Sequence, residues 1–294
     1  MTIEEENAPD TFSVLDVCVS KEAIETRFGC RWDQVARLTD RHTMVVQSWL
    51  ASRSPCAERF GNEGTKVSST GLNASILNAA LGAEFPSDMS NAEISETIES
   101  VQNYFAERGV PWRWWLGPFA QPSDMSERLE RAGMKELFRL AGMATVLPME
   151  LPAINPEVRV RLATDRRDLQ EASRIRREAF KFAPGAALHY FEDMADDWLS
   201  EDPARLYVGQ VNDGPIAGIG ALIMGEGVPG VYVLATLPEW ERQGIAKGIL
   251  TRILSDAKAE GHRLMAMTAG REASPLYWKF GFEPIFEYTL YTER

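Results

Sequence analysis

The sequence predicts an α/β protein of two domains, each a mixed, partly parallel sheet flanked by helices. The chain has 294 residues, which suits two domains of roughly 150 residues each. Strand-like and helix-like segments alternate through the second half, a pattern typical of a partly parallel sheet. Residues 148–157 carry three prolines and mark a linker. We therefore expect one domain at residues 1–152 and a second at residues 153–294.

Composition narrows the class of protein and its partners. The apolar share of 45% and the charged share of 25% are those of a globular chain with a packed core. No run reaches the roughly 20 apolar residues of a membrane helix, and the acidic start is unlike a secretory signal. We therefore expect a cytoplasmic protein without a membrane partner. The net charge of −12 argues against nucleic acid and permits a cationic substrate such as an amine.

Cysteine and histidine usage predicts neither disulfides nor a metal. The three cysteines lack paired spacing and are expected to be reduced thiols. A zinc site needs grouped ligands, whereas the three histidines are scattered singly. These six residues are Cys18, Cys30, Cys56, His42, His189 and His262.

In the first half, apolar residues at helical spacing predict a helix over residues 32–53. Residues 65–81 are rich in β-forming residues and predict a strand or a hairpin. Residues 89–109 predict a helix with a polar cap at its start and Gly109 as its stop. The remaining expected elements are a strand at 111–117, a helix at 123–133 and a strand at 140–148.

In the second half, alternation predicts a strand at residues 158–165, and helical spacing predicts helices at 166–180 and 186–199. Residues 205–227 predict a hairpin that turns at residues 212–214. The chain then continues as strand 230–238, helix 243–260, strand 263–270, helix 274–281 and strand 283–293.

The two halves share a faint repeat of helix, strand, glycine-ended helix and strand. The repeat begins with helix 89–109 in the first half and with helix 243–260 in the second. The symmetry breaks at the helix start, where the second half has Gly244 and the first half has an acidic segment with Asp88 and no glycine.

The start of helix 243–260 predicts a phosphate cradle. A helix N-terminus exposes unpaired N–H groups and the positive end of the helix dipole. Gly244 and Ala246 are small enough to let an anion approach the backbone closely. One alternative is a helix start without a ligand. Another is a dinucleotide-binding turn, but that turn requires G-x-G-x-x-G, and Gly248 completes a different spacing.

Two segments carry a resemblance to a known family. "LATLPEWERQGIAKGIL", from Leu234, and "SPLYWKFGFEP", from Ser274, resemble the GNAT superfamily of acyl-CoA-dependent N-acetyltransferases. The family signature is Q/R-x-x-G-x-G/A followed by Y-x-x-x-G-F. Gly244 and Ala246 match the small positions of the first part, and Tyr277 begins the match to the second.

The resemblance covers roughly residues 158–294 and has one departure. Glu241 stands where the family usually has Gln or Arg, which puts side-chain help to the pyrophosphate in doubt but not the backbone amides. The first half resembles a degenerate copy of the same fold, as in tandem-GNAT proteins. The fold expected from the resemblance is therefore two GNAT-like domains.

The resemblance implies that acetyl-CoA is the cosubstrate, and it implies which residues contact acetyl-CoA. The pantetheine arm would bond like an extra strand to main-chain groups of Leu234, Ala235 and Thr236. The pyrophosphate would lie on the amides of Arg242, Gln243, Gly244, Ile245, Ala246 and Lys247. An amine would attack the thioester directly, and Tyr277 would protonate the departing thiolate.

Other residues leave alternatives open. The base that deprotonates the amine could be Glu226, Glu239, an acid of residues 186–199 or a water chain. Four aromatic residues either line the acceptor pocket or belong to the core: Phe182, Tyr190, Phe191 and Trp198. Three tryptophans close together in one predicted strand either form a platform on which a sugar or base stacks or pack in the core: Trp112, Trp114 and Trp115.

The function expected from the resemblance is that of an N-acetyltransferase acting on a small-molecule or peptide primary amine. The alternative is a catalytically silent acyl-CoA-binding or regulatory protein that keeps the cradle and lacks a base.

Overall fold

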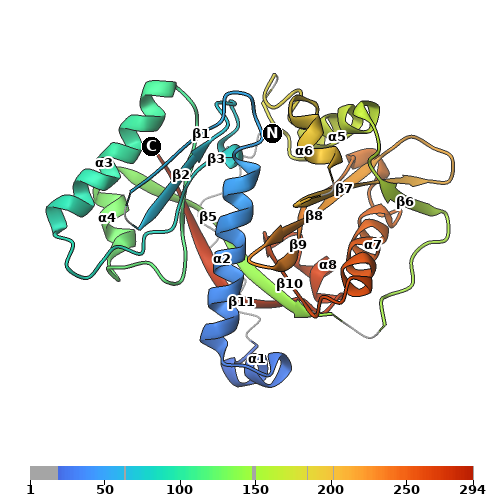
Figure 1. Cartoon of the computed structure of the whole chain (residues 1–294), viewed down its shortest axis with the longest axis horizontal. Coiled ribbons are helices and arrows are strands. Elements are labelled where there is room, and N and C mark those ends of the chain that lie inside the picture. The colour runs from blue at the N-terminus through green and yellow to red at the C-terminus, as the bar shows by residue number, and fades with distance from the viewer. Residues whose placement is uncertain (1–18, 63, 148–149, 184, 201, 294) are drawn as a thin grey trace.

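The computed structural model describes residues 19–62, 64–147, 150–183, 185–200 and 202–293 (Figure 1). Its strands in the first half are β1 (Glu58–Asn62), β2 (Thr65–Ser69), β3 (Asn78–Leu81), β4 (Arg113–Leu116) and β5 (Met134–Val146). In the second half they are β6 (Val158–Leu162), β7 (Ala204–Val211), β8 (Gly218–Gly225), β9 (Val228–Thr236), β10 (Leu264–Ala269) and β11 (Glu283–Glu293). All of them join one sheet in the order β1-β2-β3-β4-β11-β5-β10-β9-β8-β7-β6.

The helices of the first half are α1 (Lys21–Phe28), α2 (Trp32–Leu50), the 3₁₀ helix η2 (Ser75–Leu77), α3 (Asn91–Arg108) and α4 (Met125–Arg131). Those of the second half are α5 (Arg166–Ala179), η3 (Glu192–Met194), α6 (Ala195–Leu199), η4 (Pro238–Trp240), α7 (Ile245–Ala259) and α8 (Ser274–Trp278). The prediction of an α/β fold with mixed, partly parallel strands flanked by helices is confirmed. Within the described ranges, no helix has the length and apolar character that crossing a bilayer requires.

The last strand of each half lies in the middle of the shared sheet. β5 pairs antiparallel with both β10 and β11, and β11 also pairs antiparallel with β4. Each half thus contributes its final strand to the neighbour's side of the sheet, and the order α3-β4-α4-β5 recurs as α7-β10-α8-β11. The domain division at residue 152 falls between β5 and β6 and stays a prediction.

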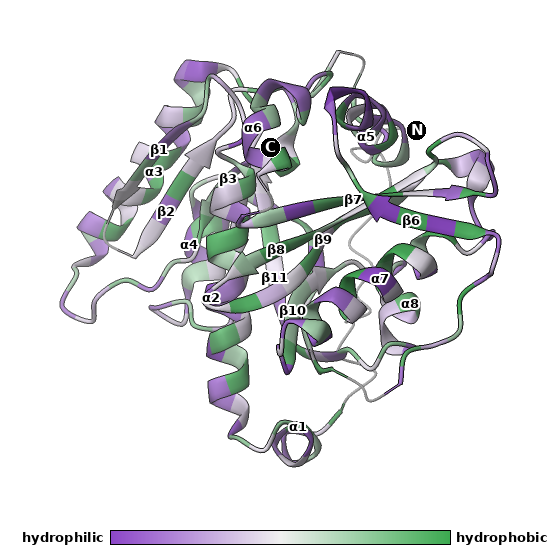
Figure 2. Ribbon diagram, turned by 45° about the vertical axis from the view of Figure 1, so that its right-hand side comes forward, coloured by the Kyte–Doolittle hydropathy of each residue, from purple (hydrophilic) through white to green (hydrophobic). Residues whose placement is uncertain are grey.

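Helix α2 packs across one face of the sheet and contacts strands of both halves (Figure 1). Hydrophobic and hydrophilic residues alternate in bands along it, as an amphipathic helix requires (Figure 2). The hydroxyl of Tyr288 on β11 donates to Asp40 Oδ1 at 2.8 Å, and burial raises the pKa of Asp40 to about 6. His42 Nδ1 lies 3.0 Å from the carbonyl oxygen of Gly225 on β8. Buried polar side chains of α2, a helix of the first half, therefore bond to two strands of the second half.

Some predicted elements differ from the structure. The helix expected over residues 186–199 is reduced to η3 and α6. Tyr190 and Phe191 are both buried, and the Phe191 amide donates to Ser173 Oγ of α5 at 3.1 Å, whereas in a helix it would donate to a carbonyl of its own segment. The Tyr190 hydroxyl donates instead to the carbonyl of Leu50 at the end of α2, at 2.7 Å. α1 and β1 were not predicted, because short segments carry little periodicity.

The tryptophans of β4 and its approach belong to the core. Trp112 stacks on Phe105 at 4.6 Å between ring centroids, and Trp115 packs edge-on to Tyr288 at 5.6 Å. Trp112, Trp114 and Trp115 are each at most 2% exposed, so they cannot form a stacking platform for a ligand.

Candidate functional site

A bulge in β9 separates this strand from its neighbour β10. Val233 and Leu234 together lie opposite Gly220 of β8, so β9 carries one extra residue. Val233 has a φ of +47°, a conformation that a β-branched residue rarely adopts. A bulge bends its strand and increases the local twist. Valine is disfavoured at this φ, so nothing in the sequence pointed to the bulge.

The bend opens a gap between β9 and β10. The two strands are parallel and pair at one register position, Gly230 with Ala266. Beyond it, in the described chain, the β10-facing main-chain groups of β9 have no strand partner as far as Thr236. The Thr236 hydroxyl is buried and makes no hydrogen bond to any described residue. This edge of β9 therefore has polar main-chain groups without a strand partner among the described residues, and an extended ligand can pair with them.

The chain leaves the gap through η4 and starts α7 without a side-chain cap. The N-cap residue Gly244 has a φ of +92°, which favours glycine, and Arg242 before it has a φ of +62°. The first amide to bond within the helix is that of Gly248, which donates to the Gly244 carbonyl at 2.8 Å. Among the described residues, the amides from Arg242 to Lys247 have no acceptor. The first turn has no acidic residue, so this N-terminus is an open anion site.

Close packing holds α7 against the sheet. A Cβ on Gly218 would lie 2.4 Å from the Ile245 side chain, and a Cβ on Gly220 would lie 2.6 Å from Ile249. Across the loop, Asn155 Nδ2 donates to the carbonyl of Gln243 at 3.2 Å. The open helix end is thus fixed beside the end of β9.

Tyr277 lies on α8, which begins five residues after β10 ends. Because β9 and β10 are parallel, their carboxyl ends share one edge of the sheet, and α8 starts from this edge. Tyr277 is 6% exposed, its ring packs 5.9 Å from that of Phe282, and burial raises its pKa. In the described structure its hydroxyl makes no hydrogen bond.

Of the acids that the sequence suggested as a base, the structure brings Glu239 to the carboxyl end of β9. Glu239 lies in η4 and is exposed. Glu226 lies in the turn at the opposite end of β9. Glu192 bonds with the Ser173 hydroxyl, and Asp197 forms an ion pair with Arg53 at 2.7 Å, so both are engaged elsewhere.

Neither feature of this site occurs in the residues of the first half that the structure describes. β3 and β4 pair in parallel at three positions along a four-residue strand, which leaves no gap between them. Helix α3 has a capping box, in which the Glu93 amide donates to Ser90 Oγ and the Ser90 amide donates to Glu93 Oε2. The carboxylate of Glu93 thus occupies the place where an anion would bind.

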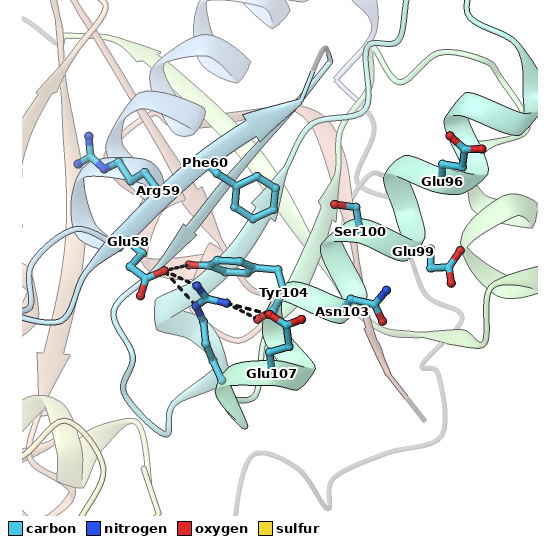
Figure 3. A pocket seen from close by; sticks show the side chains of 10 residues that line it. Glu58, Arg59, Phe60, Glu96, Glu99, Ser100, Asn103, Tyr104 and Glu107 are labelled. Carbon is cyan, nitrogen blue, oxygen red and sulfur yellow. Dashed lines mark hydrogen bonds and ion pairs between the residues drawn. The ribbon is translucent and has the colours of Figure 1, made fainter.

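A hollow of about 630 Å³ lies elsewhere, between β1 and α3 at the far end of the sheet (Figure 3). Glu58 accepts hydrogen bonds from Arg108 at 2.6 Å and from Tyr104 at 3.3 Å at one end of it. Glu96 and Glu99 of α3 are drawn along its other side. The hollow touches none of the residues of the gap or the open helix end.

Comparisons with known proteins agree with this geometry. Residues 151–279 match the family model described as acetyltransferase (GNAT) domain. A GCN5-related N-acetyltransferase from Kribbella flavida superposes with a TM-score of 0.65 at 19% identity, over 88% of this chain and 95% of that one. A GCN5-related N-acetyltransferase from Sphaerobacter thermophilus gives a TM-score of 0.58 at 16% identity, over 81% and 75% of the two chains.

A further similar structure has two such domains in tandem. A tandem GNAT protein from the clavulanic acid biosynthesis pathway superposes with a TM-score of 0.56 at 13% identity, over 88% of this chain and 94% of that one. At these identities the likeness concerns the fold alone. No curated protein matches the sequence significantly.

Proposed function

We propose that this chain, which carries a GNAT acetyltransferase domain at residues 151–279, transfers an acetyl group from acetyl-CoA to a primary amine. The observation that carries the proposal is the gap between β9 and β10 beside the uncapped N-terminus of α7. An extended arm that ends in a pyrophosphate needs both features side by side. We set the acetyltransferase domain at residues 153–294 and an accessory domain at residues 1–152.

The residues of the gap and the loop suit acetyl-CoA. The unpaired main chain of Leu234, Ala235 and Thr236 would bond to the amides of the pantetheine arm. The pyrophosphate would lie on the amides of Arg242, Gln243, Gly244, Ile245, Ala246 and Lys247. Their lack of acceptors among the described residues and the left-handed φ of Gly244 support this assignment. The thioester supplies the activated acetyl group.

Three tasks then remain for the protein: deprotonating the ammonium, stabilising the oxyanion and protonating the thiolate. The amine nitrogen bonds to the carbonyl carbon while the bond from carbon to sulfur breaks. We assign the proton that sulfur gains to the Tyr277 hydroxyl, which regains a proton through solvent as the nitrogen releases one. Burial raises the pKa of Tyr277, so the phenol keeps its proton at neutral pH.

A catalytically silent acyl-CoA-binding protein is the second candidate. It is favoured by the exposure of Glu239, because none of the acids suggested as a base is a buried side chain held against the gap.

Transfer is tested by following free-thiol release from acetyl-CoA across a panel of small amines, amino acids, peptide N-termini and aminoglycosides. We expect at least one amine to raise thiol release well above the hydrolysis seen without amine, with acetylated amine formed in equal amount. Binding of acetyl-CoA without release by any amine would instead support the silent protein.

A further inference from the structure

His42 of α2 is a fully buried imidazole to which the proposed acetyl transfer has so far given no role. Its Nδ1 atom lies 3.0 Å from the carbonyl oxygen of Gly225. A carbonyl oxygen can only accept, so Nδ1 carries the hydrogen and, in the neutral ring, Nε2 is a bare acceptor. Nε2 is buried and makes no hydrogen bond to any residue that the structure describes. A buried acceptor without a donor is unfavourable, so this nitrogen favours a ligand that brings an N–H group.

The Nε2 atom lies at the place where β9 and β10 separate. A Cβ built on Gly230 would lie 2.2 Å from Nε2 and 2.5 Å from the carbonyl oxygen of Ala266, the residue of β10 that pairs with Gly230. The imidazole also stacks on the ring of Tyr232, two residues further along β9, at 5.7 Å between ring centroids. Glycine at position 230 therefore makes room for the imidazole at the closed end of the gap.

The closed end of the gap is also where the thioester of acetyl-CoA would lie. The proposed pyrophosphate site is the start of α7, which follows the carboxyl end of β9. From there the pantetheine arm would run along β9 from Thr236 to Leu234, against the direction of the strand. Its far end, which carries the acetyl group, would therefore point toward Gly230 and His42.

Two glycines of β8 show which face of the gap His42 occupies. Side chains alternate along a strand, so Gly220 and Gly225 face opposite sides of the sheet. A Cβ on Gly220 would meet Ile249 of α7, and a Cβ on Gly225 would meet His42. Because α7 covers the first face, an acceptor amine would approach the thioester from the face that bears His42.

We propose that His42 is the general base of the acetyl transfer, supplied by the first half of the chain to the site in the second. The acceptor ammonium would donate to Nε2, directly or through one water, and its N–H bond would break as the proton passes to Nε2. The free amine would then attack the thioester, and its second proton is the one that reaches Tyr277 through solvent. The imidazolium would return its proton to solvent after the product leaves. The inference rests on the proposed function.

The surroundings of His42 keep the imidazole neutral. Burial lowers the pKa of His42 and outweighs the opposing effects of the nearby main-chain carbonyls and of the Glu226 carboxylate. β8, β10 and residues 141–146 of β5 carry no titratable side chain. The titratable groups on the elements around the ring are Glu226 in the turn after β8, Tyr232 of β9, and Asp40 of α2 with its partner Tyr288 of β11. At neutral pH, Nε2 is therefore free to accept a proton.

Steady-state kinetics of His42→Asn with the best amine of the panel test the proposal. The asparagine amide nitrogen can take over the bond to Gly225, whereas nothing replaces Nε2. We expect kcat at neutral pH to fall by roughly 10²-fold or more, with acetyl-CoA affinity unchanged in calorimetric titration. Without a base the variant can use only free amine. Its kcat/KM should therefore rise about tenfold per pH unit up to the pKa of the amine, whereas that of the original enzyme levels off above the pKa of His42.

Nitrogen-15 NMR of the unaltered protein provides a reading that does not depend on a folded variant. We expect His42 to show a neutral ring with the hydrogen on Nδ1. Its Nε2 resonance should shift when the amine is added to protein saturated with CoA, which cannot react. An Nε2 resonance that does not respond to the amine would overturn the proposal.

Asp40→Asn is the matched control, because Asp40 is a buried acid of the same helix and asparagine can still accept the hydrogen bond from Tyr288. It should keep the original kcat and pH profile. A His42→Asn enzyme with the original kcat and profile, or one that loses acetyl-CoA affinity as much as kcat, would overturn this inference and leave the acetyltransferase standing. A protein that releases no thiol with any amine would overturn the proposed function and the base together.

Discussion

Gly244→Glu is expected to abolish acetyl-CoA binding. The substitution places a carboxylate at the open N-terminus of α7, where the amides from Arg242 to Lys247 have no acceptor among the described residues. This carboxylate would satisfy the amides and repel a pyrophosphate. Calorimetric titration of the variant with acetyl-CoA measures the loss.

Backbone strain has to be separated from charge in this experiment. The φ of +92° at Gly244 would cost a non-glycine residue about 1–2 kcal/mol, while a Cβ there would meet Asn155 at an ordinary contact of 3.5 Å. Gly244→Asn is the control, because asparagine tolerates the left-handed region and carries no charge. We expect it to keep most of the affinity. Unchanged affinity in a folded Gly244→Glu protein would remove the phosphate role from this loop.

Tyr277→Phe is expected to lower kcat by roughly 10²-fold or more with little change in acetyl-CoA affinity. The ring stays in place against Phe282, and the one proton available to the thiolate from this side chain is lost. Steady-state thiol release with the best amine of the panel gives kcat, and titration gives the affinity.

Tyr207→Phe is the matched control for this hydroxyl deletion. Tyr207 is also a buried tyrosine of the second half, but its hydroxyl donates to Asp256 Oδ2 at 2.8 Å, on the α7 side. Its loss should reduce stability and leave kcat close to that of the original protein. A Tyr277→Phe enzyme with the original kcat would reduce Tyr277 to a packing residue.

The features that the sequence could predict are those that depend on the preferences of a few neighbouring residues. The polar cap at the start of α3, which could be Ser90 or Asn91 from the sequence and is Ser90 in the structure, and the stop at Gly109 follow from side-chain and backbone preferences. The start of α7 after Gly244 follows in the same way, because a left-handed residue ahead of an apolar helix calls for glycine. The fold class and the order of most elements were predictable for this reason.

The parts that could not be predicted depend on contacts between distant segments. Nothing in β11 itself shows that it pairs with β4 rather than remaining with its own half. The bulge at Val233 contradicts the preference of valine and is imposed by the surrounding sheet. Arg113 at the start of β4 is buried beside the ring of Phe138 on β5, a contact between segments that are apart in the sequence.

Calorimetric titration of the whole protein with acetyl-CoA tests the central claim most directly. The claim is that the gap between β9 and β10 and the open end of α7 form the acetyl-CoA site, and that the first half, with β3 and β4 fully paired and α3 capped, has none. The account predicts one acetyl-CoA per chain. A stoichiometry near two, or no binding, would contradict it.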